Sequence, residues 1–233
     1  MSTTNTQIPT LDGKGNIPAY VVRPNGAPRG AIIVIQEVFG VNPGVRKKTE
    51  DWAAKGYLAV APDVFWRQQP GVSLDSDIPE EFQQAIKLMM AHDFYLGIQD
   101  VEAVIHWIRR NEGVAKVGLV GFCMGGKVAY MAATRTDVDA SVGYYGVGID
   151  QMLNESHAIA KVLMLHVPTA DGFVSPEAQK AMHAGLDGNP HVTIYDYEGL
   201  DHGFAAEHGV RRNEEGAQLA DKRTADFFAQ HIG

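Results

Sequence analysis

Apolar and polar positions alternate along the chain in blocks that predict strands followed by helices. Short, almost continuously apolar runs predict buried strands, and they cover residues 17–22, 31–35, 57–62, 117–121, 140–145, 162–166 and 192–197. Between them lie segments with helical spacing of apolar residues, at residues 45–55, 80–91, 95–109, 124–133, 176–185 and 216–231. This pattern predicts an α/β fold of the α/β-hydrolase type, with a mostly parallel central sheet and helices on both faces.

The 233 residues contain no repeat or long linker, so we expect a single domain over residues 1–233. A formal charge of −8 argues against nucleic acid or an anionic membrane as a partner. The polar start carries no secretion signal pattern, and one cysteine cannot form an internal disulfide. We therefore expect a cytoplasmic protein, monomeric or a small homo-oligomer.

The only cysteine lies in the sequence GFCMGG at residues 121–126, between a strand-like and a helix-like run. This is the G-x-nucleophile-x-G turn that follows a strand in α/β-hydrolases, with sulfur in place of the usual serine oxygen. The alternative is a buried structural cysteine beside a glycine-rich turn. Residues of the required types further along the chain favour Cys123 as a nucleophile.

A cysteine nucleophile needs a base, and the base needs a group that orients it. Asp171 follows the strand at residues 162–166 and is the candidate acid, although an Asp-Gly pair is also common in turns. His202 follows the last strand and is the candidate base. His166 is the second candidate, whereas His208 lacks the glycine-flanked position after a strand.

Acyl transfer also requires two N–H groups that face the developing oxyanion. The backbone N–H of Met124 follows the nucleophile directly, and we assign the second to Val38, in the loop after residues 31–35. The helix that begins near Met124 directs its positive end at Cys123, which favours the thiolate.

Four motifs resemble those of the dienelactone hydrolase family, also called carboxymethylenebutenolidases: QEVFGVN (36–42), GYLAVAPD (56–63), GLVGFCMGG (118–126) and GYYGVG (143–148). The resemblance implies a hydrolase of small-molecule esters or lactones that needs no metal or organic cofactor. It implies a catalytic triad of Cys123, Asp171 and His202 and a thioester intermediate. It also implies that Glu37 holds the resting thiol away from the triad until an anionic substrate displaces it.

The sequence departs from this family where arginines bind the substrate carboxylate, because those positions are Phe82 and Ala206. Arg67, Arg211 and Arg212 are the conceivable substitutes. We therefore expect a substrate that is less anionic than dienelactone. The candidate pocket is apolar, and its expected lining is Phe39, Trp66, Phe82, Tyr145, Phe173 and Phe204.

Two other functions remain open on the same residues. One is a promiscuous esterase, thioesterase or phosphoester hydrolase that uses the same triad, although phosphoryl transfer benefits from more positive charge than the motifs supply. The other is a non-catalytic thiol sensor, which would need no orienting acid. Whether residues 79–90 act as a lid over the site stays open.

Overall fold

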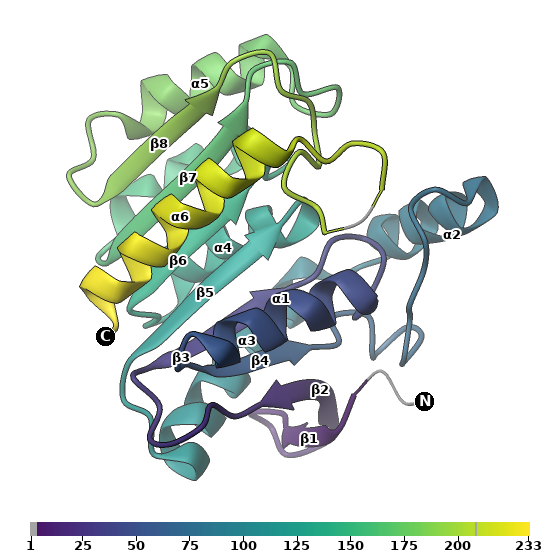
Figure 1. Ribbon diagram of the computed structural model, residues 1–233, viewed down its shortest axis with the longest axis vertical. Coiled ribbons are helices and arrows are strands. Elements are labelled where there is room, and N and C mark those ends of the chain that lie inside the picture. Colours follow the sequence, from purple (N-terminus) through teal and green to yellow (C-terminus); the bar gives the residue numbers. More distant parts are fainter. Residues whose placement is uncertain (1–3, 208) are drawn as a thin grey trace.

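A sheet of eight strands forms the centre of the computed structural model, which describes residues 4–207 and 209–233 (Figure 1). The strand order is β1-β2-β4-β3-β5-β6-β7-β8. β1 and β2 pair antiparallel, as do β2 and β4, and all other neighbours are parallel. The bounds are β1 Thr6–Pro9, β2 Asn16–Val22, β3 Ala31–Ile35, β4 Leu58–Pro62, β5 Val117–Phe122, β6 Ala140–Tyr144, β7 Val162–Pro168 and β8 Val192–Tyr197.

Helices cover both faces of this sheet (Figure 1). α1 and α6 pack on one face and α3 and α4 on the other, because their apolar residues fall into two separate core clusters. The bounds are α1 Pro43–Ala54, α2 Pro79–Met90, α3 Phe94–Trp107, α4 Met124–Arg135, α5 Pro176–Leu186 and α6 Glu214–His231. A π-helical segment at Ile108–Glu112 extends α3, and a 3₁₀ helix covers Asp150–Ala158.

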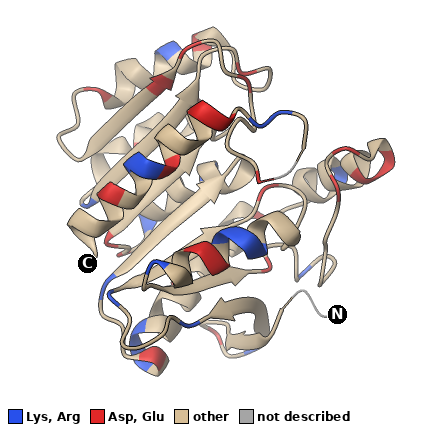
Figure 2. Ribbon diagram, viewed as in Figure 1, with Lys and Arg blue, Asp and Glu red and all other residues tan. Residues whose placement is uncertain are grey.

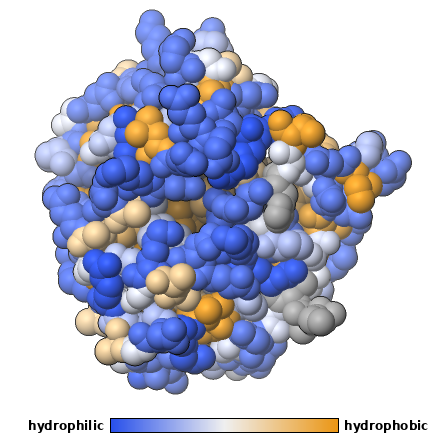
Figure 3. All heavy atoms as spheres, viewed as in Figure 1, coloured by the Kyte–Doolittle hydropathy of each residue, from blue (hydrophilic) through white to orange (hydrophobic). Residues whose placement is uncertain are grey.

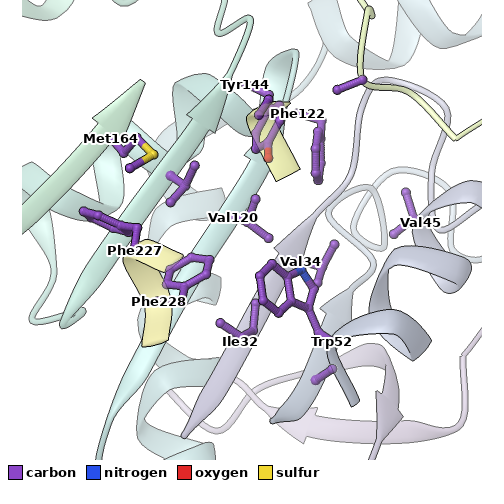
Figure 4. Packing of buried hydrophobic residues seen from close by; sticks show 14 of the residues in the cluster. Ile32, Val34, Val45, Trp52, Val120, Phe122, Tyr144, Met164, Phe227 and Phe228 are labelled. Atoms are coloured by element: carbon purple, nitrogen blue, oxygen red, sulfur yellow. The ribbon is translucent and has the colours of Figure 1, made fainter. Parts of the chain in front are cut away.

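Strand β3 shows how the apolar pattern produces the two cores. Its side chains alternate between the faces, so Ile32 and Val34 contact the α1/α6 side while Ile33 and Ile35 contact the α3/α4 side. On the first side, Trp52 and Phe228 meet edge to face at 5.3 Å over the strands (Figure 4). The charged side chains lie mainly on helices and loops (Figure 2).

The predicted fold class is confirmed, and every predicted strand and helix is present with each end within two residues. The sequence analysis missed β1 and the 3₁₀ helix. Among the described residues, none of the helices is long and apolar enough to cross a membrane. The six parallel strands, β3 to β8, end at one edge of the sheet. The loops that follow β3, β5, β7 and β8 there carry the candidate site residues.

Candidate active site

Cys123 occupies a strained turn between β5 and α4. Its φ of 55° and ψ of −113° lie outside the regions that residues with a side chain usually adopt. Two glycines make the turn possible: a Cβ on Gly121 would lie 1.9 Å from the carbonyl oxygen of Gly125, and a Cβ on Gly125 would lie 2.6 Å from that of Ile35. The turn therefore lifts the partly exposed thiol above the end of the sheet.

His202 and Asp171 form the ion-pairing contact expected of a base and its orienting acid. Nδ1 of His202 lies 2.9 Å from Oδ2 of Asp171, and the two side chains are 9% and 0% exposed. Burial lowers the pKa of His202, but its hydrogen bonds to Asp171 and to Cys123 outweigh burial and raise the pKa to about 10. The imidazole therefore lies between a carboxylate and a thiol and is a strong acceptor for the thiol proton.

Hydrogen bonds from three backbone N–H groups fix the loops that carry the acid and the base. Oδ1 of Asp201 accepts hydrogen bonds from the N–H of Gly172 at 2.9 Å and from the N–H of His202 at 2.7 Å. Oδ1 of Asp171 accepts from the N–H of Phe173 at 2.7 Å. The sequence analysis missed Asp201, although its position directly before His202 was a usable signal.

Two aromatic rings hold the imidazole from its sides. The ring centroids of Tyr145 and Phe173 lie 4.9 Å and 4.8 Å from that of His202, both close to edge-on. Tyr145 is buried and adopts a φ of 39°, which is rare for a residue with a large side chain. Together with Asp171, these rings restrict how far His202 can turn.

Two backbone N–H groups are available where an oxyanion hole is expected. Val38 lies in the loop after β3, and Met124 is the first residue of α4. Among the hydrogen bonds of the described residues, neither N–H is paired with an acceptor. Both residues are almost fully buried, at 3% and 2% exposure, and Val38 also lines the cavity that contains Cys123, so an oxyanion hole formed by these two N–H groups remains a prediction.

Glu37 lies between two cavities. The larger cavity, of about 650 Å³, contains Cys123 and His202, and the smaller one, of about 390 Å³, contains Lys48. Oε1 of Glu37 accepts a hydrogen bond from the hydroxyl of Tyr145 at 3.1 Å. Burial raises the pKa of Glu37, against the opposing effects of His202 and of Tyr145.

The hydrogen bonds described for Glu37 and for Cys123 lead to different partners. The carboxylate is bound by Tyr145, whereas the thiol interacts with His202 and helps to raise the pKa of that imidazole. A role of Glu37 in holding the thiol away from the triad therefore remains a prediction.

The predicted pocket residues divide into three groups. Phe39, Phe82 and Phe173 line the larger cavity, and Tyr145 lines the smaller one, together with Phe39. Trp66 and Phe204 line neither of the two cavities. Residues that the sequence analysis missed complete the larger cavity, including Ile86, Met89, Val147 and Val210. The spacing of apolar residues along α2 was the available signal for two of them.

Trp66 and Phe204 were wrong predictions, and both have a structural explanation. Trp66 donates its indole N–H to Asp100 at 2.8 Å and packs at Gly15, near the antiparallel end of the sheet. Phe204 is 0% exposed, and its ring lies 4.7 Å from that of Tyr197 in the core. An apolar ring serves a core and a pocket equally well, so the residue type alone did not separate them.

The second candidate base belongs to a different network. His166 is 0% exposed, and its ring nitrogens lie 2.7 Å from the hydroxyl of Tyr197 and 2.9 Å from that of Thr224. Burial, together with Arg223, lowers its pKa to about 3. Both nitrogens are engaged below the site, so His166 cannot receive the proton of Cys123. His208 lies outside the described residues.

Two of the three arginines considered as substitutes are engaged elsewhere. Arg67 forms two bonds to Asp100, at 2.7 Å and 3.2 Å. Arg212 donates to Glu214 at 2.8 Å and to the carbonyl of Ala206 at 3.0 Å. Only Arg211 lines the larger cavity. In the described part of the chain, no group of three or more His, Cys, Asp or Glu residues is arranged to hold a metal ion.

Comparisons with known proteins found a matching family model, sequence relatives and similar solved structures. The model of the Dienelactone hydrolase family matches residues 17–232. A provisionally named carboxymethylenebutenolidase of Azospirillum brasilense is 41% identical, with 99% of this chain and 100% of the relative covered. The carboxymethylenebutenolidase of Pseudomonas putida is 36% identical, with 98% and 97% covered. Among solved structures, a provisionally named dienelactone hydrolase from Klebsiella pneumoniae has a TM-score of 0.82 and 26% identity, with 97% of this chain and 100% of that chain covered.

Proposed function

Because the chain belongs to the dienelactone hydrolase family, we propose that it is an enzyme that hydrolyses small carboxylic esters or lactones. We assign Cys123 as the nucleophile, His202 as the base and Asp171 as the group that orients the base. The observation that carries this assignment is the position of His202, with its Nδ1 2.9 Å from Asp171 and its imidazole in the same cavity as the Cys123 thiol.

The first half of the reaction begins when His202 accepts the proton of the Cys123 thiol. The raised pKa of His202 favours this transfer, and the resulting thiolate is the form that attacks. A bond forms between Sγ and the carbonyl carbon, and the carbonyl oxygen becomes negatively charged. The backbone N–H groups of Val38 and Met124 donate to this oxygen.

The second half returns the enzyme to its starting state. His202 gives its proton to the leaving oxygen as the carbon–oxygen bond breaks, which leaves a thioester on Cys123. Water then attacks the thioester while His202 accepts a proton from it, and the carbon–sulfur bond breaks as His202 returns this proton to the sulfur. The products are an alcohol and a carboxylic acid, or a hydroxy acid from a lactone.

Glu37 is proposed as a residue that controls the thiol. It lines the cavity that contains Cys123, and Tyr145 holds its carboxylate. Burial raises the pKa of Glu37, and its carboxylate interacts with the charge of His202. A change in the charge or position of Glu37 therefore alters the electrostatic field at the thiol and the imidazole.

The direct test is to trap the thioester. Acid-quenched samples taken during turnover of an aryl acetate should carry one acetyl group on the peptide that contains Cys123, released by hydroxylamine. The Cys123→Ala variant should lack both the adduct and the turnover while it keeps the wild-type melting curve. Turnover that survives in this variant would exclude Cys123 as the nucleophile.

A further inference from the structure

Helix α2 presents an apolar face to the larger cavity. Phe82, Ile86 and Met89 follow one another at helical spacing and all line the cavity. The ring of Phe39 extends this surface, with its centroid 5.9 Å from that of Phe82. These four side chains offer no charge and no hydrogen-bonding group, and Gln83 is the one polar side chain of α2 that lines the cavity.

Apolar side chains from other segments also line the cavity. Phe173 and Val210 line the cavity and are 48% and 89% exposed. Hydrophobic surface is visible on the right of Figure 3, where α2 projects, on a face that is otherwise largely hydrophilic. Covering such surface with an apolar ligand releases about 25 cal/mol for each Å² removed from water.

The charges of the cavity oppose a carboxylate ligand. Glu37 and Asp77 contribute carboxylates, and Arg211 is the only lysine or arginine among the described residues that line it. The guanidinium of Arg211 lies 3.9 Å from Asp201, and its side chain is 45% exposed. Water and a counter-charge therefore already screen this cation.

The remaining positive charges are not free to bind an anion there. His202 gains its positive charge beside the carboxylate of Asp171. Lys48 faces the smaller cavity, 3.2 Å from Glu207. At the two positions where the family resemblance places arginines, Phe82 and Ala206 line the cavity instead. A carboxylate placed in the cavity would meet Glu37 without a compensating ion pair.

We propose that the substrate of this site is an uncharged ester or lactone whose aryl or branched alkyl group lies between α2 and Phe173. The inference rests on the proposed function and narrows its substrate class. The apolar group contributes affinity by burial, and a carboxylate on the same group is rejected because it would be desolvated beside Glu37.

Two aryl esters of the same shape test the charge preference. Methyl meta-acetoxybenzoate is neutral, and meta-acetoxybenzoate carries a carboxylate at the same position. Each kcat/KM is divided by the rate constant for hydrolysis of the same ester by hydroxide, which corrects for intrinsic reactivity. We expect this corrected kcat/KM to be at least about tenfold higher for the neutral ester. An equal ratio, or a preference for the carboxylate, would overturn the inference while leaving the proposed function intact. No turnover of either ester would overturn both.

Variants on α2 test where the apolar group binds. Ile86→Ser should lower the ratio of kcat/KM for methyl meta-acetoxybenzoate to that for the small ester trifluoroethyl acetate by about tenfold. Met90→Ser is the matched control, because Met90 is on the same helix, is 78% exposed and lines neither described cavity. Met89→Gln should repeat the effect and serves where Ile86→Ser does not fold. An unchanged ratio in the folded cavity variant would refute the binding mode.

Discussion

A Cβ on Gly121 would lie 1.9 Å from the carbonyl oxygen of Gly125, so the strand and the helix on either side of Cys123 touch backbone to backbone. Gly121→Ala should therefore force the turn apart and cost at least about 2 kcal/mol in the free energy of unfolding. In a chain of this size that corresponds to a fall of about 4–8 °C in melting temperature.

Gly188→Ala is the control for this prediction, because a Cβ there meets no atom within 4 Å. Its melting temperature should stay close to that of the wild type. Equal melting temperatures for the two variants would show that the turn relaxes without cost.

The carboxylate of Asp171 should matter more for rate than for folding. Asp171→Asn keeps the shape but removes the charge that helps to raise the pKa of His202, so we expect a loss of about 10²–10⁴-fold in kcat. The pKa of His202, measured by NMR titration, should fall in the same variant. A kcat within threefold of the wild type would contradict the assigned role.

The chain offers a matched His–Asp pair as the control. His183 and Asp187 lie 3.0 Å apart on the surface, with side chains 32% and 60% exposed. Asp187→Asn should leave kcat unchanged, because this pair is remote from the thiol and borders no described cavity.

Burial of Glu37 should make the protein less stable at high pH than it would be without this carboxylate. The pKa of Glu37 is raised in the folded state, so the folded protein holds the proton more tightly than the unfolded chain. The destabilisation caused by ionised Glu37 is absent below the pKa of this group in the unfolded chain, about 4.3, and complete above its pKa in the folded protein. Glu37→Gln should therefore raise the melting temperature at about pH 8 and lose this advantage near about pH 4. A constant difference across this range would show that Glu37 titrates normally.

His166 should produce the opposite trend. Its pKa is lowered to about 3, so on acidification the unfolded chain takes up a proton that the folded protein refuses. The stability advantage of neutral His166 is present above about pH 6.5 and is lost as pH falls, at about 1.4 kcal/mol per pH unit. The gap in unfolding free energy between wild type and His166→Gln should narrow from about pH 7 to about pH 4. A gap independent of pH would mean that folded His166 takes up its proton as readily as His166 in the unfolded chain does.

The sequence predicted the elements whose side chains are buried on both faces. Strand β3 has the bounds predicted, Ala31–Ile35, because every residue in it is apolar and buried. Strand β1 was missed because only Ile8 of its residues is buried, and its pairing with β2 depends on backbone contacts.

The candidate triad was predictable because each member follows a strand at the same edge of the sheet. The pocket was predictable only in part, since Trp66 is fixed by Asp100, which lies 34 positions away in the chain. The positive φ of Tyr145 and the bridge through Asp201 depend on distant loops, so local sequence carries no signal for their geometry.

One consequence of the elbow concerns how this protein can be measured. Since the chain has a single cysteine, which lines the larger cavity, one alkylating molecule modifies one proposed nucleophile. Incorporated label therefore counts the molecules whose single thiol is free and accessible, independently of total mass. In addition, the labelling rates of a series of maleimides of increasing size would measure the width of the cavity entrance beside α2.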